Sequence, residues 1–94
     1  MPQLVSIESD MPFSTYPTPA LIVDARELAC PLPLLKAKQG LHQIQVGQYL
    51  LVWATDRGSV RDFQTYTQLS EHELVHFHED QNTFGYLLRK GQKT

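Results

Sequence analysis

The sequence of 94 residues has a single cysteine and no long apolar run. With one cysteine the chain can form no internal disulfide, and a free thiol is typical of a reducing compartment. No stretch approaches the roughly 18 consecutive apolar residues that a membrane-spanning helix needs. The N-terminus also lacks the basic segment and apolar stretch of a secretory signal. We therefore expect a cytoplasmic protein that does not enter a membrane.

An excess of basic residues is also missing. Eight Lys and Arg stand against ten Asp and Glu, which gives a net charge of −2. Proteins that bind nucleic acid usually show a basic face, so we expect no direct contact with nucleic acid. There is no glycine-rich phosphate loop, and His76 and His78, two residues apart, have no obvious third metal ligand. We expect neither a metal nor a cofactor.

Proline is concentrated at the N-terminus, where four of the six prolines lie within residues 1–20. Such a density disfavours both helices and central strands. We expect residues 1–19 to form a flexible or loosely packed extension, with 4–7 as a candidate edge strand. The compact domain is then expected to span residues 20–94.

The rest of the chain alternates between apolar runs and helical patterns. Apolar side chains recur at three- and four-residue steps from Leu34 to Ile44, the spacing of one helix face. A second helix is expected to open at 56–59, with Asp56 or Ser59 as its cap, and to end near Thr65. The expected elements in order are strand 21–25, helix 31–42, strand 48–55, the second helix, strand 73–79 and strand 83–89.

This β-α-β-α-β-β order predicts an α/β (α+β) two-layer sandwich. Two helices on one face of a four-stranded mixed sheet would bury the apolar residues of both layers. In strand 73–79 the residues alternate, so we expect the side chains to fall on two faces. Val75 and Phe77 are expected on one face, and Leu74, His76 and His78 on the other.

The cysteine lies where the first strand gives way to the first helix, within Ala29-Cys30-Pro31-Leu32-Pro33. Proline is favoured in the first helical turn, so Pro31 at the first helical position makes Cys30 the expected N-cap. The unpaired N–H groups and the dipole of a helix start stabilise a thiolate. Although free cysteines are most often buried and inert, we predict an exposed Cys30 with a pKa below its ordinary value.

These residues resemble the TusA (SirA-like) family of sulfur carriers, and the similarity runs from about Leu21 to Gly91. It rests on Asp24-Ala25-Arg26-Glu27-Leu28-Ala29-Cys30-Pro31-Leu32-Pro33, Gly47-Gln48, Thr55-Asp56, Val60-Arg61-Asp62-Phe63, Glu71-His72-Glu73-Leu74 and Tyr86-Leu87-Leu88-Arg89-Lys90-Gly91. The resemblance implies the same fold, and a Cys30 that accepts sulfane sulfur as a persulfide and passes it on.

The resemblance also implies partners. A cysteine desulfurase or a rhodanese-type protein would be the sulfur donor, and a DsrE-like protein or another thiol carrier the acceptor. The sulfur would enter tRNA thiolation, sulfur oxidation or cofactor sulfuration. Such a sulfurtransferase turns over little without its partners, and we expect a monomer. The candidates for partner contact around Cys30 are Glu27, Pro31, Leu32, Pro33, Asp56 and Arg61.

Three positions depart from the family pattern. Glu27 stands where glycine is frequent, at a position where a positive φ would strain a side chain. Ala29 stands where many members carry arginine, so a cation that could stabilise the thiolate is missing. Leu32 replaces the glutamate of the tRNA-thiolation members, and this change bears on partner choice.

Two other functions fit the same residues. The chain could be a non-catalytic interaction or regulatory domain with an RNA-related role, although the acidic balance argues against this. It could also be a thiol redox module, but such modules normally use two cysteines. For Arg61, partner contact and a solvated helix face are equally good interpretations, and for Asp62 the solvated face is favoured.

Overall fold

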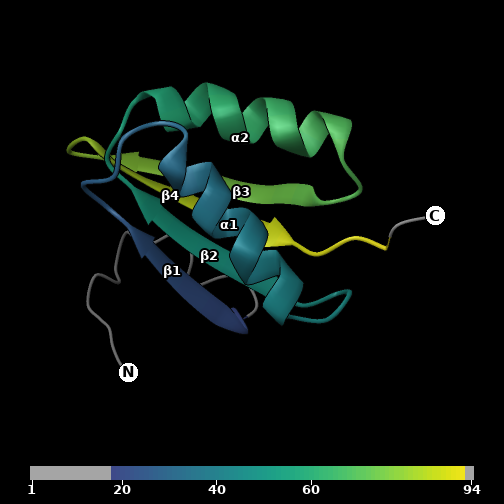
Figure 1. The fold of residues 1–94 in the computed structure, drawn as a ribbon. Helices are drawn as coiled ribbons and strands as arrows, with labels where there is room; N and C mark the ends of the chain where they lie inside the picture. The colour runs from purple at the N-terminus through teal and green to yellow at the C-terminus, as the bar shows by residue number, and fades with distance from the viewer. Residues whose placement is uncertain (1–17, 93–94) are drawn as a thin grey trace.

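The computed structural model describes residues 18–92. Six elements follow one another along the chain (Figure 1). They are β1 (Leu21–Ala25), α1 (Leu32–Gln43), β2 (Tyr49–Ala54), α2 (Gly58–Leu69), β3 (Glu73–Asp80) and β4 (Thr83–Arg89). The expected N-terminal extension and its candidate edge strand fall almost wholly on residues 1–17, outside the described residues.

The four strands form one mixed sheet in the order β1-β2-β4-β3. β1 is parallel to β2, while β4 pairs antiparallel with both β2 and β3. Both helices lie on the same face of the sheet (Figure 1), with α1 on β1 and β2 and α2 on β3. The predicted two-layer α/β sandwich is therefore confirmed.

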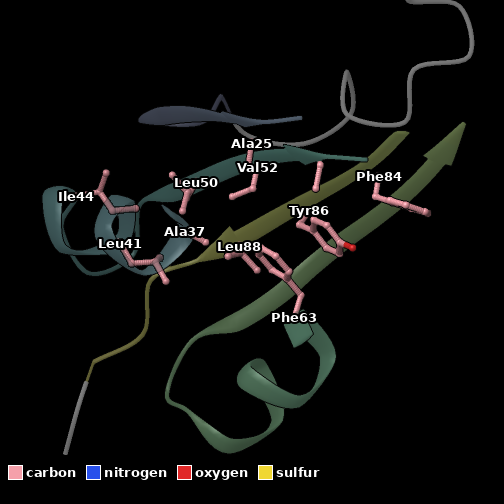
Figure 2. Close-up of a cluster of buried hydrophobic side chains, with 11 residues drawn as sticks. Ala25, Ala37, Leu41, Ile44, Leu50, Val52, Phe63, Phe84, Tyr86 and Leu88 are labelled. Atoms are coloured by element: carbon pink, nitrogen blue, oxygen red, sulfur yellow. The ribbon is translucent and has the colours of Figure 1, made fainter. Parts of the chain in front are cut away.

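The core fills the space between the sheet and the two helices (Figure 2). Every second residue of β2 faces it, namely Leu50, Val52 and Ala54, and all three are fully buried. Tyr86 on β4 stacks its ring on that of Phe63 on α2, with 4.0 Å between the centroids. Its hydroxyl forms a buried hydrogen bond of 2.7 Å with that of Ser59. The second helix is thus held to the sheet by an aromatic stack and a polar contact.

The second helix continues beyond Thr65, where we expected it to end, and reaches Leu69. Val60, Phe63 and Tyr66 follow one another at three-residue steps and form the face of the helix that packs into the core. The hydroxyl of Thr67 donates to the carbonyl oxygen of Phe63 at 2.9 Å, which satisfies its polar group inside the helix. Polar residues on either side of Tyr66 make the apolar periodicity of this segment hard to recognise in the sequence.

The expected faces of β3 were wrong because the strand contains a register shift between Leu74 and His76. An extra residue in one strand of an antiparallel pair breaks the two-residue alternation. Leu74 pairs with Leu88, Phe77 pairs with Tyr86, and both β3 side chains pack against the core. Leu74 thus shares a face with Phe77 and is separated from His76 and His78.

Neither helix in the described part of the chain combines the length and apolar character that crossing a bilayer requires. Each helix has 12 residues.

Replacing Tyr86 by Phe should lower the free energy of unfolding by about 1–3 kcal/mol, because the buried Ser59 hydroxyl would lose its partner. Urea unfolding monitored by circular dichroism measures this loss. The double variant Ser59→Ala/Tyr86→Phe should be less destabilised than the sum of the two single variants, since neither hydroxyl is then left alone. Strict additivity would contradict the coupling.

Candidate functional site

Cys30 lies in the loop between β1 and α1, and its residue is exposed. Because β1 and β2 are parallel, this loop and the one after β2 leave the sheet at the same edge (Figure 1). A Cβ atom on Gly58 would lie 3.2 Å from Cys30 Cβ and 3.5 Å from Cys30 Sγ. The second helix therefore begins directly against the cysteine, and a side chain at Gly58 would crowd it.

The cysteine is not the N-cap of the first helix, contrary to expectation. The helix begins at Leu32, Pro31 occupies the capping position, and no side chain caps it. The Cys30–Pro31 peptide bond is cis. The backbone N–H of Cys30 donates to Asp56 Oδ2 at 3.2 Å, so this residue belongs to the loop.

Asp56 connects the two loops at this edge of the sheet. The same Oδ2 atom that accepts the Cys30 N–H also accepts the N–H of Gly58 at 3.1 Å. Gly58 is the first residue of α2, where backbone N–H groups have no partner within the helix. The N-cap is Arg57, so the prediction of Asp56 or Ser59 as the cap is wrong. Asp56, one residue before the N-cap, nevertheless satisfies a donor at the helix start, and Ser59 points into the core.

The thiol of Cys30 donates a hydrogen bond to Asp62 Oδ2, with 2.6 Å between sulfur and oxygen. This bond raises the pKa of the Cys30 thiol above its ordinary value, and desolvation and the negative charges of Asp62 and Asp56 act in the same direction. The prediction of a lowered pKa is therefore wrong. The physical reason is that the carboxylates of Asp62 and Asp56 act on the sulfur, while Cys30 is not the N-cap of the first helix.

Asp62 is the functional candidate that sequence reasoning placed on a solvated face. It stands four residues after Gly58, so both residues lie on one side of α2. Since Gly58 contacts the cysteine, a side chain one turn later reaches the sulfur. The four-residue spacing of Gly58 and Asp62 is visible in the sequence. It indicates a contact between Asp62 and the sulfur only when Gly58 is known to lie against Cys30.

The other candidate residues lie in the loop before α1, in the first turn of α1 and on α2. Glu27 has φ +71°, so the positive φ suspected at this position is present, and its N–H donates to Thr55 Oγ1 at 2.8 Å. Leu32 is 44% exposed in the first turn of α1, whereas Pro33 is buried. Arg61 is exposed and, with its neighbour Asp62, lines a groove of about 470 Å³ between the two helices.

Asp56 and Asp62 both form hydrogen bonds with Cys30, Asp56 with its backbone N–H and Asp62 with its sulfur. Pro31, Leu32 and Glu27 belong to the same loop and helix start. Within residues 18–92 no group of three or more His, Cys, Asp or Glu side chains could hold a metal ion.

The fold and the site define a class: a small α/β domain that presents one exposed thiol at the edge of its sheet. Residues 21–90 match the sequence model of the family described as Sulfurtransferase TusA. The chain belongs to this TusA family.

Relatives agree with this assignment. The Sulfur carrier protein TusA of Allochromatium vinosum is 43% identical over 68 residues, which cover 72% of this chain and 90% of that protein. YrkI of Bacillus subtilis is 30% identical over 70 residues, covering 74% of this chain and 93% of its own. The crystal structure of a SirA-like protein from Desulfitobacterium hafniense shares the fold, with a TM-score of 0.66 and 19% identity over 77% of this chain and 99% of its own.

The rate at which iodoacetamide alkylates Cys30 should rise at a higher pH than it does for an ordinary cysteine. The bond to Asp62 holds the proton, so the reactive thiolate is scarcer through the neutral range. The measurement is the alkylation rate against pH, with the urea-unfolded chain as reference. An inflection below that of the unfolded chain would contradict the geometry of this site.

Proposed function

We propose that this protein accepts sulfane sulfur on Cys30 as a persulfide and passes it to a partner protein. The observation that carries the proposal is the exposed thiol at the edge of the sheet in a chain that belongs to the TusA family. Cys30 is the only cysteine in the sequence, so no second thiol of the chain can compete for the sulfur. In this proposal residues 20–94 form the carrier domain.

The chemistry is an exchange between sulfur atoms. The Cys30 thiolate attacks the outer sulfur of a donor persulfide, a new S–S bond forms, and the donor's S–S bond breaks. The donor cysteine leaves as a thiolate and takes up a proton, which balances the proton lost from Cys30. A thiolate of the acceptor then attacks the outer sulfur on Cys30 in the same way. No electrons are gained or lost overall, and the exchange needs no metal or cofactor.

The partners we propose are proteins with reactive cysteines. A cysteine desulfurase or a rhodanese-type protein would load Cys30, and a DsrE-like protein or another thiol carrier would discharge it. The protein would act as a monomer and would turn over only with these partners. The sulfur would enter tRNA thiolation, sulfur oxidation or cofactor sulfuration.

The surface beside the thiol has features suited to protein contact. Leu32 and Leu35 on the first turns of α1 are 44% and 45% exposed. Exposed leucines at the start of the helix that follows the cysteine would become buried when a partner covers the thiol, and such apolar contacts favour association. We therefore propose that Leu32 takes part in partner recognition.

Incubation with a cysteine desulfurase and free cysteine, or with a rhodanese and thiosulfate, should add the mass of one sulfur atom to the protein. Intact-mass spectrometry measures the gain, which should disappear on addition of a reducing thiol. Cys30→Ser should gain nothing, and its circular dichroism spectrum serves as the control for folding. If the wild-type mass stays unchanged under conditions that load a known carrier, the proposal fails.

Leu32→Glu should leave loading by inorganic polysulfide within about twofold of wild type, because the thiol and its hydrogen bonds remain. Loading by a protein donor should change by about fivefold or more, since a charge replaces an apolar side chain at the docking surface. Leu69→Glu is the matched control, because Leu69 is 82% exposed at the far end of α2. Equal effects of the two variants on protein-dependent loading would argue against a role for Leu32.

A further inference from the structure

We propose that Asp62 is a specificity-determining residue, which restrains the Cys30 thiol in the free protein so that small sulfur compounds react slowly and protein partners are favoured. This inference rests on the proposed function. Asp62 contacts the reacting atom itself, with 2.6 Å between Oδ2 and the sulfur.

The charged groups that act on the Cys30 sulfur are carboxylates. Asp62 reaches the sulfur from α2, Asp56 in the loop after β2 bonds to the backbone N–H of Cys30, and the negative charges of both oppose formation of a thiolate. The neighbouring arginines are occupied by other acids. Arg26 donates two bonds of 2.8 Å to Asp24, and Arg57 lies 3.2 Å from Glu79. Within residues 18–92, these two arginines are therefore paired with acids other than those beside the thiol.

The remaining charged neighbours do not alter this balance. Arg61 precedes Asp62 on α2 and is exposed, and Glu27 in the β1–α1 loop is exposed as well. The hydrogen bond to Asp62 and the negative charges of Asp62 and Asp56 raise the pKa of the Cys30 thiol. An exposed thiol in an acidic surrounding is accessible but slow, because only the thiolate is a nucleophile.

The small sulfur compounds that could react with Cys30 are themselves charged. Inorganic polysulfide, thiosulfate and glutathione disulfide are anions, and the carboxylates of Asp62 and Asp56 repel them at close range. The same carboxylates also affect discharge, in which the Cys30 sulfur leaves as a thiolate. Their negative charges disfavour this thiolate, so a small thiol should remove the sulfur from Cys30 slowly.

A protein partner acts on the site differently from a small molecule. A docked protein covers the site and can displace Asp62 from the sulfur, whereas a small molecule cannot. Loading by a protein donor should therefore depend less on the Cys30–Asp62 bond than loading by polysulfide. The ratio of the two loading rates is the specificity that we assign to Asp62.

The experiment compares wild type with Asp62→Asn, which keeps the shape of the side chain and removes its charge. The alkylation rate at neutral pH and the rate of loading by inorganic polysulfide should each rise by about three- to tenfold, the effect of losing one exposed hydrogen bond to a charge. The inflection of the alkylation profile should move to lower pH. The ratio of desulfurase-dependent to polysulfide-dependent loading should fall by a similar factor.

Two further variants separate this role from general effects of charge or folding. Asp62→Glu should recover most of the wild-type specificity, because a carboxylate is restored. Asp80→Asn removes an equal charge from an exposed position at the end of β3 and should behave as wild type.

The inference is overturned if Asp62→Asn leaves the alkylation profile and the loading ratio unchanged, or slows both reactions. Alkylation needs no sulfur donor, so its profile tests the restraint even if the carrier function fails. Conversely, a wild-type protein that no donor can load would refute the proposed function and leave the alkylation result standing.

Discussion

One carboxylate oxygen, Oδ2 of Asp56, determines how the parts of the site meet. It accepts the N–H of Cys30, in the β1–α1 loop, and the N–H of Gly58, the first residue of α2, and these two residues are separated in the chain by the whole of α1 and β2. The parallel pairing of β1 and β2 brings both loops to one edge, and this shared acceptor fixes the distance between them. Without it, the backbone N–H groups of Cys30 and Gly58 would lose their common acceptor, and the cysteine loop would be linked to the segment after β2 only by the bond from Glu27 N–H to Thr55 Oγ1 and to α2 by the bond from the thiol to Asp62.

The site contains two opposing tendencies. A cysteine just before a helix is placed where backbone dipoles favour a thiolate, which is the basis of many reactive cysteines. Here the thiol is directed to Asp62, and its proton is held. A carrier has to be accessible to large partners, so burial cannot protect its sulfur from other electrophiles. Negative charge can protect it, because a nearby carboxylate lowers the fraction of reactive thiolate and leaves the surface accessible.

The sequence was sufficient to predict most of the fold, because apolar periodicity reports burial directly. Strand 21–25 and the order of all six elements followed from it. The faces of β3 could not be predicted in this way, because a register shift depends on pairing with β4 and is not visible in the strand's own apolar pattern. Cys30 was found from its neighbours in sequence, whereas Asp62 acts on it across 32 positions. Such a contact depends on how α2 is rotated, which local spacing does not determine.

That rotation is set by two adjacent stripes on α2. Ser59 and Phe63 point to the sheet, where they contact the hydroxyl and the ring of Tyr86. Gly58 and Asp62, each one position earlier, consequently point to Cys30. Because one residue corresponds to about 100° of rotation, a small change in how Phe63 packs would carry the carboxylate away from the sulfur. The packing of a buried aromatic pair thus sets where the Asp62 carboxylate lies relative to an exposed thiol.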